Sequence, residues 1–223
     1  MKRLPLIFIL MTVLSAALSA LTLTACSDNG KESATEGLLY TLNQDGESYK
    51  CDGLGTSTAT EIIIPSKYKG LPVTRIGGNA FKECIEITSV VIPDSVTSIG
   101  FCAFYECSAL ESVTIGDSVT TIEFSAFNKC FSLESVTIPD SVTTIGDSAF
   151  YDCFKLADVS LPVTVESLGS NVFNNTAYYN DENNWTDGVL YVDNYLTNAK
   201  ADISGSREIR ENTRIICPSA FWN

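Results

Sequence analysis

The stretch Ile115-Gly-Asp-Ser-Val-Thr-Thr-Ile-Glu-Phe-Ser-Ala-Phe-Asn-Lys-Cys-Phe-Ser-Leu-Glu-Ser-Val-Thr137 is one complete copy of a 23-residue unit that recurs along the chain. Its landmark is a small residue followed by phenylalanine, which falls at the same interval five times: Ala80-Phe81, Ala103-Phe104, Ala126-Phe127, Ala149-Phe150 and Val172-Phe173. A fixed period of about 20 to 50 residues is typical of a solenoid, in which only the stacking of units buries their apolar sides. The sequence therefore predicts a stack of coils.

Each coil is expected to contain two short strands and one helical turn. In the run Leu110–Ile115, alternation places Val113 inward and Thr114 outward, and the β-branched residues favour an extended chain. The run Val119–Ile122 predicts the second strand. The segment Ala-Phe-x-x-Cys-x-x-Leu spaces its apolar residues as a helical turn does. Strands of successive coils should pair in parallel, about 4.8 Å apart.

Two columns of repeated residues are expected to lie inside the stack. The phenylalanines are interpreted as core, because a continuous core needs the same large side chain in every coil. The second column holds Cys84, Cys107, Cys130 and Cys153, followed by Thr176. Disulfides are an alternative in an exported protein. We expect free, buried thiols, since side chains at equivalent places of parallel coils point the same way. A linear ladder also lacks the converging geometry of a metal site.

The pattern Leu-x-x-Val-x-Ile-Pro-x-Ser-Val-Thr-x-Ile-Gly-x-x-Ala-Phe-x-x-Cys resembles the BspA-like class of leucine-rich repeats over residues 62 to 173. We expect a β-rich α/β solenoid, a right-handed leucine-rich repeat superhelix with short parallel strands and short helical turns. The repeats are assigned to residues 62–180. The resemblance also implies a function, which is adhesion to host matrix proteins or to neighbouring cells.

The N-terminus has the build of an export signal. Met1 to Ala25 has two basic residues followed by an apolar stretch, which predicts a signal peptide over residues 1–25. Leu23-Thr-Ala-Cys26 resembles the lipobox of bacterial lipoproteins, which implies lipidation of Cys26 and a flexible tether over residues 26–37. The alternatives are an ordinary signal peptide or a retained helical anchor. We expect an exported protein, lipid-anchored at the bacterial cell surface in the outer membrane or the cell membrane.

Both ends of the repeat region carry extra segments. Residues 38–61 predict a capping hairpin around the turn Asn43–Gly46, and the first coil has five surplus residues near Ser66–Leu71. Residues 181–206 resemble a hairpin insertion of the same family, with its turn at Asp193-Asn194. Residues 207–223 predict an incomplete final repeat, with Glu208–Arg210 as its strand and Ala220-Phe221 in the core. We expect the parent chain to continue with more coils.

Composition bears on the classes of function. The chain has 14 Lys and Arg against 27 Asp and Glu, a formal net charge of −13, and no histidine. An acidic surface repels phosphate backbones, so nucleic acid is not an expected partner. The lack of histidine removes serine and cysteine mechanisms that need a histidine base, and it removes histidine-bound metals. We expect a monomeric protein that is no enzyme and has no catalytic residue, cofactor or metal.

Binding should use outward positions that vary between coils. On the first strand these form a ribbon of hydroxyls and two carboxylates, whose partner would be an extracellular protein or glycan. Its candidate residues are Thr88, Val91, Glu111, Thr114, Glu134, Thr137 and Ser160, with Ala157 among them. Some of the aromatics beside the core pair are also candidates: Phe101, Phe124, Tyr105 and Tyr151. The alternative is a structural spacer that presents a missing C-terminal domain.

Overall fold

The computed structural model describes residues 34–200 and 208–221. The expected signal peptide (1–25), the expected lipidation site Cys26 and most of the expected tether (26–37) lie outside the described residues. So does the end of the expected insertion, and the last residues of the chain.

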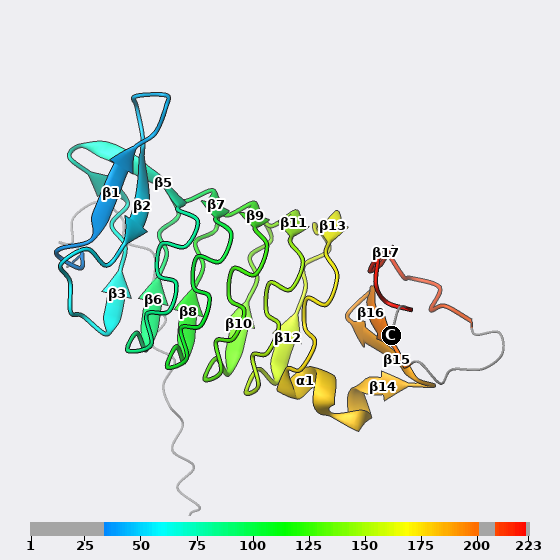
Figure 1. The fold of residues 1–223 in the computed structure, drawn as a ribbon. Helices are drawn as coiled ribbons and strands as arrows, with labels where there is room; N and C mark the ends of the chain where they lie inside the picture. The colour runs from blue at the N-terminus through cyan, green and yellow to red at the C-terminus, as the bar shows by residue number, and fades with distance from the viewer. Residues whose placement is uncertain (1–33, 201–207, 222–223) are drawn as a thin grey trace, which may run out of the picture. The chain divides into compact units, whose positions relative to one another are not determined.

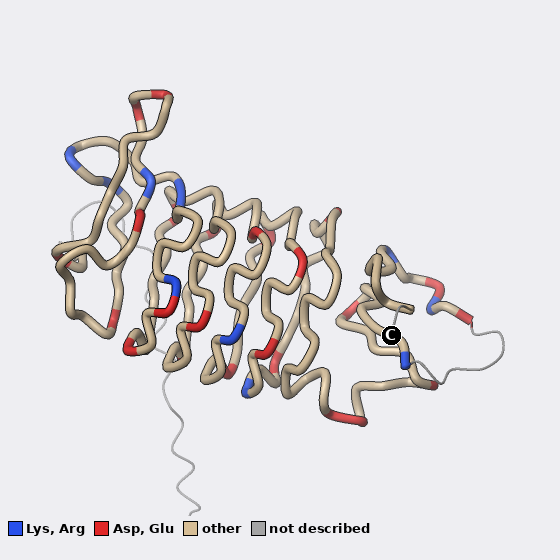
Figure 2. Tube along the Cα trace, in the orientation of Figure 1, with Lys and Arg blue, Asp and Glu red and all other residues tan. Residues whose placement is uncertain are grey.

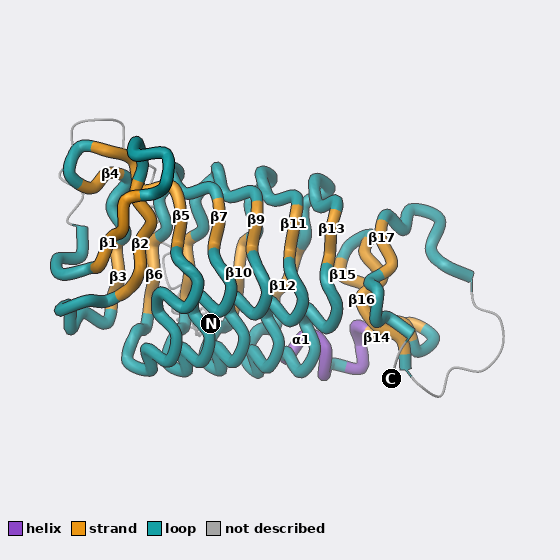
Figure 3. The backbone as a smooth tube through the Cα atoms, turned by 45° about the horizontal axis from the view of Figure 1, so that its top comes forward, coloured by secondary structure: helices purple, strands orange, loops and turns teal. Residues whose placement is uncertain are grey.

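The described chain is a solenoid whose coils contribute strands to two parallel ladders (Figure 1). The first strands of the coils are β3 (Glu61–Ile63), β6 (Ser89–Val91), β8 (Ser112–Thr114), β10 (Ser135–Thr137) and β12 (Asp158–Ser160). The second strands are β5 (Leu71–Ile76), β7 (Ser98–Ile99), β9 (Thr121–Ile122), β11 (Thr144–Ile145) and β13 (Ser167–Leu168). Figure 3 shows the second strands in one row. The predicted leucine-rich repeat solenoid is confirmed.

The register of the ladders follows the repeat. In the second ladder one row of Cα partners rises by one repeat at each step, through Arg75, Ser98, Thr121, Thr144 and Ser167. In the first ladder β3 pairs with β6, β6 with β8, and β10 with β12, all in parallel. The hydrophobic pattern fixes this register, because a slip by one residue would turn the buried side chains outward.

Each coil has a third side, formed by the residues between its second strand and the first strand of the next coil. This side is not the helical turn that the apolar spacing predicts. Its residues form turns, and two of them in each full coil have a left-handed backbone with φ between 51° and 61°. In the first coil these are Asn79 and Glu83, whose N–H groups donate to the carbonyls of Phe101 and Tyr105 in the next coil at 2.9 and 2.7 Å. A left-handed residue costs roughly 1 kcal/mol and ends a helix, but here it turns its N–H toward the neighbouring coil.

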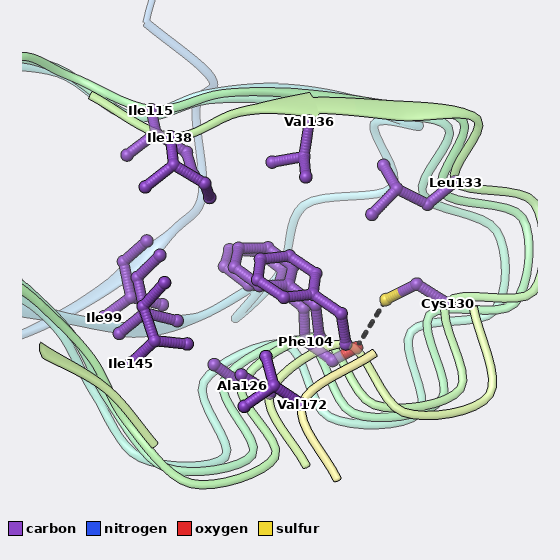
Figure 4. Packing of buried hydrophobic residues seen from close by; sticks show 14 of the residues in the cluster. Ile99, Phe104, Ile115, Ala126, Cys130, Leu133, Val136, Ile138, Ile145 and Val172 are labelled. Carbon is purple, nitrogen blue, oxygen red and sulfur yellow. Dashed lines mark hydrogen bonds between the residues drawn. The ribbon is translucent and has the colours of Figure 1, made fainter. Parts of the chain in front are cut away.

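The core is a stack of phenylalanine rings enclosed by the strands and turns (Figure 4). All five rings are fully buried, and neighbouring rings are nearly parallel with centroids 5.1 to 5.7 Å apart. Isoleucines and valines from both ladders, such as Ile99 and Val136, close the space around them. The interpretation of the phenylalanine column as core is therefore confirmed.

The cysteine column lies beside this stack, and all the cysteines that the structure describes are free. Cys107, Cys130 and Cys153 are fully buried, and each thiol donates to a phenylalanine carbonyl of the preceding coil at 3.0 to 3.2 Å. Figure 4 draws one of these bonds, from Cys130 to the carbonyl of Phe104. Cys84 differs, because it lies in the first of these coils and is only half-buried. The expectation of buried thiols holds for the other three.

The N-terminal hairpin covers the first coil. Strands β1 (Leu39–Leu42) and β2 (Tyr49–Gly53) are antiparallel, and β2 pairs in parallel with β5, so the hairpin extends the second ladder. The surplus residues of the first coil form a smaller hairpin, in which β4 (Lys67–Tyr68) pairs with the start of β5. The ring of Tyr68 stacks on that of Tyr40, with centroids 4.1 Å apart.

At the other end, Thr176 takes the fifth place of the cysteine column and ends the regular coils. Its hydroxyl accepts a hydrogen bond from the N–H of Tyr179, which caps the short helix α1 (Ala177–Asn180). The helix leads into the 3-10 helix η1 (Glu182–Asn184). No helix among the described residues has the length and apolar character that crossing a membrane requires.

A small sheet follows, made of β14 (Trp185–Thr186), β15 (Val189–Val192), β16 (Tyr195–Ala199) and β17 (Ile215–Ile216). Strands β15 and β16 flank Asp193-Asn194, the residues expected to turn. The hydroxyl of Tyr195 is buried and donates to the carbonyls of Pro162 and Val165 at 2.8 and 3.2 Å. The hairpin is thus tied to the last regular coil.

Two expectations for the final repeat are wrong. Glu208–Arg210 forms no strand and is exposed, and the parallel pairing with β16 is made by β17 instead. The guanidinium of Arg210 lies over the ring of Tyr191. Ala220 is buried as expected, but the side chain of Phe221 is 56% exposed. The carbonyl of Ala220 accepts from Ala199 at the end of β16, so this segment meets the inserted hairpin and not the phenylalanine column.

Candidate binding surface

The predicted ribbon belongs to the first ladder, whose strands follow one another with one strand per coil (Figure 1). Five of its seven candidate residues are exposed, namely Glu111, Thr114, Glu134, Thr137 and Ser160, and the expected Ala157 is exposed as well. Parallel pairing sets Ser135 opposite Asp158 and Thr137 opposite Ser160, so equivalent side chains stand side by side. The alternation that predicted these positions therefore places them together.

The two remaining candidates are less accessible. Thr88 is half-buried, and its hydroxyl donates to the carbonyl of Thr60 in the preceding coil at 3.2 Å. Val91 is half-buried at the end of β6, where its backbone pairs with Ile63 and with Thr114. The accessible ribbon thus begins one coil later than the sequence predicts.

The inserted hairpin limits the ribbon at its other end. The carboxylate of Asp193 accepts from the hydroxyl of Ser160 at 3.2 Å and from the N–H of Leu161 at 2.7 Å. Ser160 is therefore already engaged, although it is exposed. Of the two ribbon carboxylates, that of Glu134 lies 3.7 Å from the ammonium of Lys155. The hydroxyls of Thr114 and Thr137, with the carboxylate of Glu111, form the centre of this surface.

The four aromatic candidates divide into two pairs. Phe101 and Phe124 follow one another in neighbouring coils and are 49% and 54% exposed. Tyr105 and Tyr151 are half-buried beside the third side of the coils. The ammonium groups of Lys82 and Lys129 lie 5.4 and 5.2 Å from the ring centre of Tyr105.

A pair of opposite charges strengthens the contact around Tyr105. The ammonium of Lys129 lies 2.6 Å from the carboxylate of Glu106 in the preceding coil. This hydrogen bond raises the pKa of Lys129 and lowers the pKa of Glu106. The pair joins two coils at the surface, and Lys129 takes a place at which the other coils have Glu83, Glu106, Asp152 and Asn175.

One surface was not found from the sequence. A groove of about 720 Å³ lies between the N-terminal hairpin and the outer face of the second ladder. Arg75, Phe101 and Glu123 line it, together with the hairpin residues Asn43 and Lys50. The signal was present, since Arg75 and Glu123 both depart from the residues that other coils have at those places.

The protein-family model for the BspA type leucine rich repeat region matches residues 74–196 of this chain, in six copies. Among solved structures, a leucine-rich repeat protein of T. pallidum is 32% identical with a TM-score of 0.60, and the match covers 65% of this chain and 67% of that one. A leucine-rich repeat protein of Bacteroides ovatus is 30% identical with a TM-score of 0.56, over 62% of this chain and 37% of its own length. No curated protein matches the sequence. With its repeats, ladders and phenylalanine column, the chain belongs to the family of BspA type leucine-rich repeat proteins.

Proposed function

We propose that this protein is a non-enzymatic lipoprotein of the bacterial cell surface, whose solenoid binds an extracellular protein or glycan. Members of the BspA type family are typically binding proteins without enzymatic activity. The observation that carries the proposal is the ribbon of exposed hydroxyls and carboxylates on the first ladder. Repeated surfaces of this kind suit large partners, because many weak contacts add up over successive coils.

The rigidity of the ladder supports binding through the ribbon. Thr114 stands on β8, which is paired in parallel with β6, and Thr137 stands on β10, which is paired in parallel with β12, while Val136 between the outward residues of β10 is buried in the core. A partner that contacts such side chains loses less free energy to ordering than a partner that binds a flexible loop. The ribbon would therefore bind its ligand without a change in its own backbone.

Binding is tested with the full chain, purified in a detergent without a sugar headgroup and presented to matrix proteins and to a glycan array at physiological salt. We expect at least one partner to bind with a dissociation constant in the micromolar range or below. Thr114→Lys together with Thr137→Lys should weaken that binding by about tenfold or more, which is about 1.4 kcal/mol. The matched control is Ser167→Lys, an exposed hydroxyl residue on the second ladder. Failure of every probe to bind would contradict the adhesion proposal and favour the spacer.

The anchor is tested separately, because Cys26 lies outside the described residues. Cells that express the chain would be fed a fatty acid with an alkyne tag. We expect label in the wild-type protein and none in Cys26→Ser. Equal labelling of Cys102→Ser and the wild type is the control, since Cys102 is a half-buried cysteine of the second coil. Label that persists in Cys26→Ser would exclude lipidation at that residue.

A further inference from the structure

The groove beside the N-terminal hairpin lies on the opposite ladder from the ribbon. Its volume of about 720 Å³ falls within the range of small-molecule sites, roughly 300 to 1,000 Å³. One wall is the hairpin around the β1–β2 turn, which projects past the ends of β5 and β7 (Figure 1). The other wall is the outer face of the first three coils. The groove thus exists only where the hairpin stands beside the coils.

Two charged residues in this groove break the repeat. Arg75 takes a place that small hydroxyl residues fill in the other coils: Ser98, Thr121, Thr144 and Ser167. Glu123 takes a place that glycine fills in the other coils: Gly77, Gly100, Gly146 and Gly169. These two exceptions meet across the coil between them, where Gly100 leaves room, and their charged groups lie 3.5 Å apart. The second carboxylate oxygen of Glu123 accepts from the N–H of Phe101 at 2.9 Å.

The ring of Phe101 forms a flat surface next to this ion pair. It lies directly on the backbone of Gly78, where an added Cβ would come within 2.2 Å of a ring carbon. A side chain at Gly78 would push the ring of Phe101 out of this position. With one side on the backbone and 49% of the side chain exposed, the ring presents its other side to the groove.

The charges that line the groove are balanced. Lys50 is paired with Asp52 at 2.9 Å and Arg75 with Glu123, so both lining cations already have a carboxylate partner. Acidic and basic segments alternate along the hairpin and first coils (Figure 2). The carboxylates of Asp45 and Glu123 both line the groove, which disfavours sulfated or sialylated chains and acidic peptides. The amide of Asn43 and the hydroxyls of Thr74 and Thr97 add uncharged hydrogen-bonding groups.

We propose that this groove binds a neutral oligosaccharide. A sugar ring has a face of C–H groups and a rim of hydroxyls that both donate and accept. The C–H face would pack on the ring of Phe101. Neighbouring hydroxyls would donate to Glu123 and accept from Arg75, whose planar groups are held in place by each other. The inference rests on the proposed function, in that the solenoid binds an extracellular ligand, but it uses the other ladder.

A peptide fits the groove less well. One way in which an extended peptide binds is by adding a strand to a free sheet edge. The strand β5 behind the groove is paired with β2 on one side and β7 on the other, and β7 is paired in turn with β9. The backbone groups of the strands behind the groove are therefore occupied, and an added strand could pair here only with β1, at the edge of the sheet.

The experiment titrates the full chain, in a detergent without a sugar headgroup, with maltotetraose, cellotetraose and chitotetraose by calorimetry. We expect one of these probes to bind. Phe101→Ala and Glu123→Gln should each weaken binding about tenfold or more. Matched controls are Phe124→Ala, an equally exposed phenylalanine one coil away, and Glu134→Gln on the ribbon, neither of which lines the groove. Arg75→Ala, whose side chain is 53% exposed, serves as an additional groove variant if Phe101→Ala does not fold.

Several outcomes would overturn the groove proposal. One is that a heparin tetrasaccharide or an extended peptide binds while no neutral probe does. Another is that neutral probes bind with the same affinity to wild type and to Phe101→Ala and Arg75→Ala. If a neutral probe instead loses affinity with the ribbon variants Thr114→Lys and Thr137→Lys, the groove proposal fails and the proposed function stands. If no probe binds, the groove proposal fails, while the matrix-protein screen still decides the proposed function.

Discussion

The interior of the stack and its face beside the N-terminal hairpin use the same repeat in different ways. In the interior, Phe127, Cys130 and their neighbours repeat with little change, and these residues are buried. Beside the N-terminal hairpin the repeat is broken by Arg75 and by Glu123, and both residues line a groove. Regular positions are therefore needed for stacking, whereas departures from the pattern leave side chains available for recognition. The predictions below test this division between buried and exposed members of the repeat.

The largest effect is expected from two phenylalanines of one coil. Phe127→Ala removes a fully buried ring from the stack and should lower the free energy of unfolding by about 3 to 5 kcal/mol. Phe124→Ala, at a position that is 54% exposed, should change it by about 0.5 kcal/mol or less. Urea unfolding followed by circular dichroism measures both. Equal losses would show that the exposed ring also belongs to the core.

A smaller effect is expected where the inserted hairpin meets the last regular coil. Tyr195→Phe removes a buried hydroxyl and leaves the carbonyls of Pro162 and Val165 without this donor, so it should cost about 1 to 3 kcal/mol. The same unfolding experiment measures the loss. A variant as stable as the wild type would mean that the hairpin does not hold the end of the stack.

A smaller loss in the free energy of unfolding is expected from substitutions in the cysteine column. Cys130→Ala removes the thiol that donates to the carbonyl of Phe104 and leaves a small cavity, which should cost about 1 kcal/mol. Cys130→Ser keeps a donor at that place but buries a more polar group. If both variants unfold at the urea concentration of the wild type, the thiol contributes nothing to stability.

Thiol labelling distinguishes the buried cysteines from the half-buried ones and requires no substitution. Burial raises the pKa of Cys107 and of Cys51 to about 12, so almost no thiolate is present at pH 8. Cys84 and Cys102 are half-buried and should react first with a maleimide, Cys26 aside. The rate at the buried thiols should rise as the pH increases toward their pKa. Mass spectrometry of digested protein assigns each label, and early labelling of Cys130 would contradict the buried column.

Much of the fold could be predicted because one interval governs it. The spacing of the phenylalanines gives the register of the ladders, and alternation gives the buried faces of the strands. The third side could not be predicted, since apolar spacing shows which side chains are buried and not how the backbone turns. Its left-handed residues include Asn79, Cys102 and Lys129 but no glycine, which is the residue type that most often marks such a backbone.

The candidate surfaces were predictable to different degrees. The ribbon follows from alternation within one strand, and Glu111, Thr114 and Thr137 are exposed as expected. The groove depends on a hairpin that stands beside coils distant in sequence, and on the room left by Gly100. Only a comparison of each coil with its neighbours would have singled out Arg75 and Glu123.

The ladders also determine how the molecule responds to mechanical force. Hydrogen bonds between coils run along the stacking direction, for example from the N–H of Phe104 to the carbonyl of Ala126. A pull between the first and the last coil would load these bonds in series, so the coils should detach one at a time. Each detached coil of 23 residues releases roughly 80 Å of extended chain. The stack would then lengthen stepwise under tension, and the coils still stacked would keep their fold.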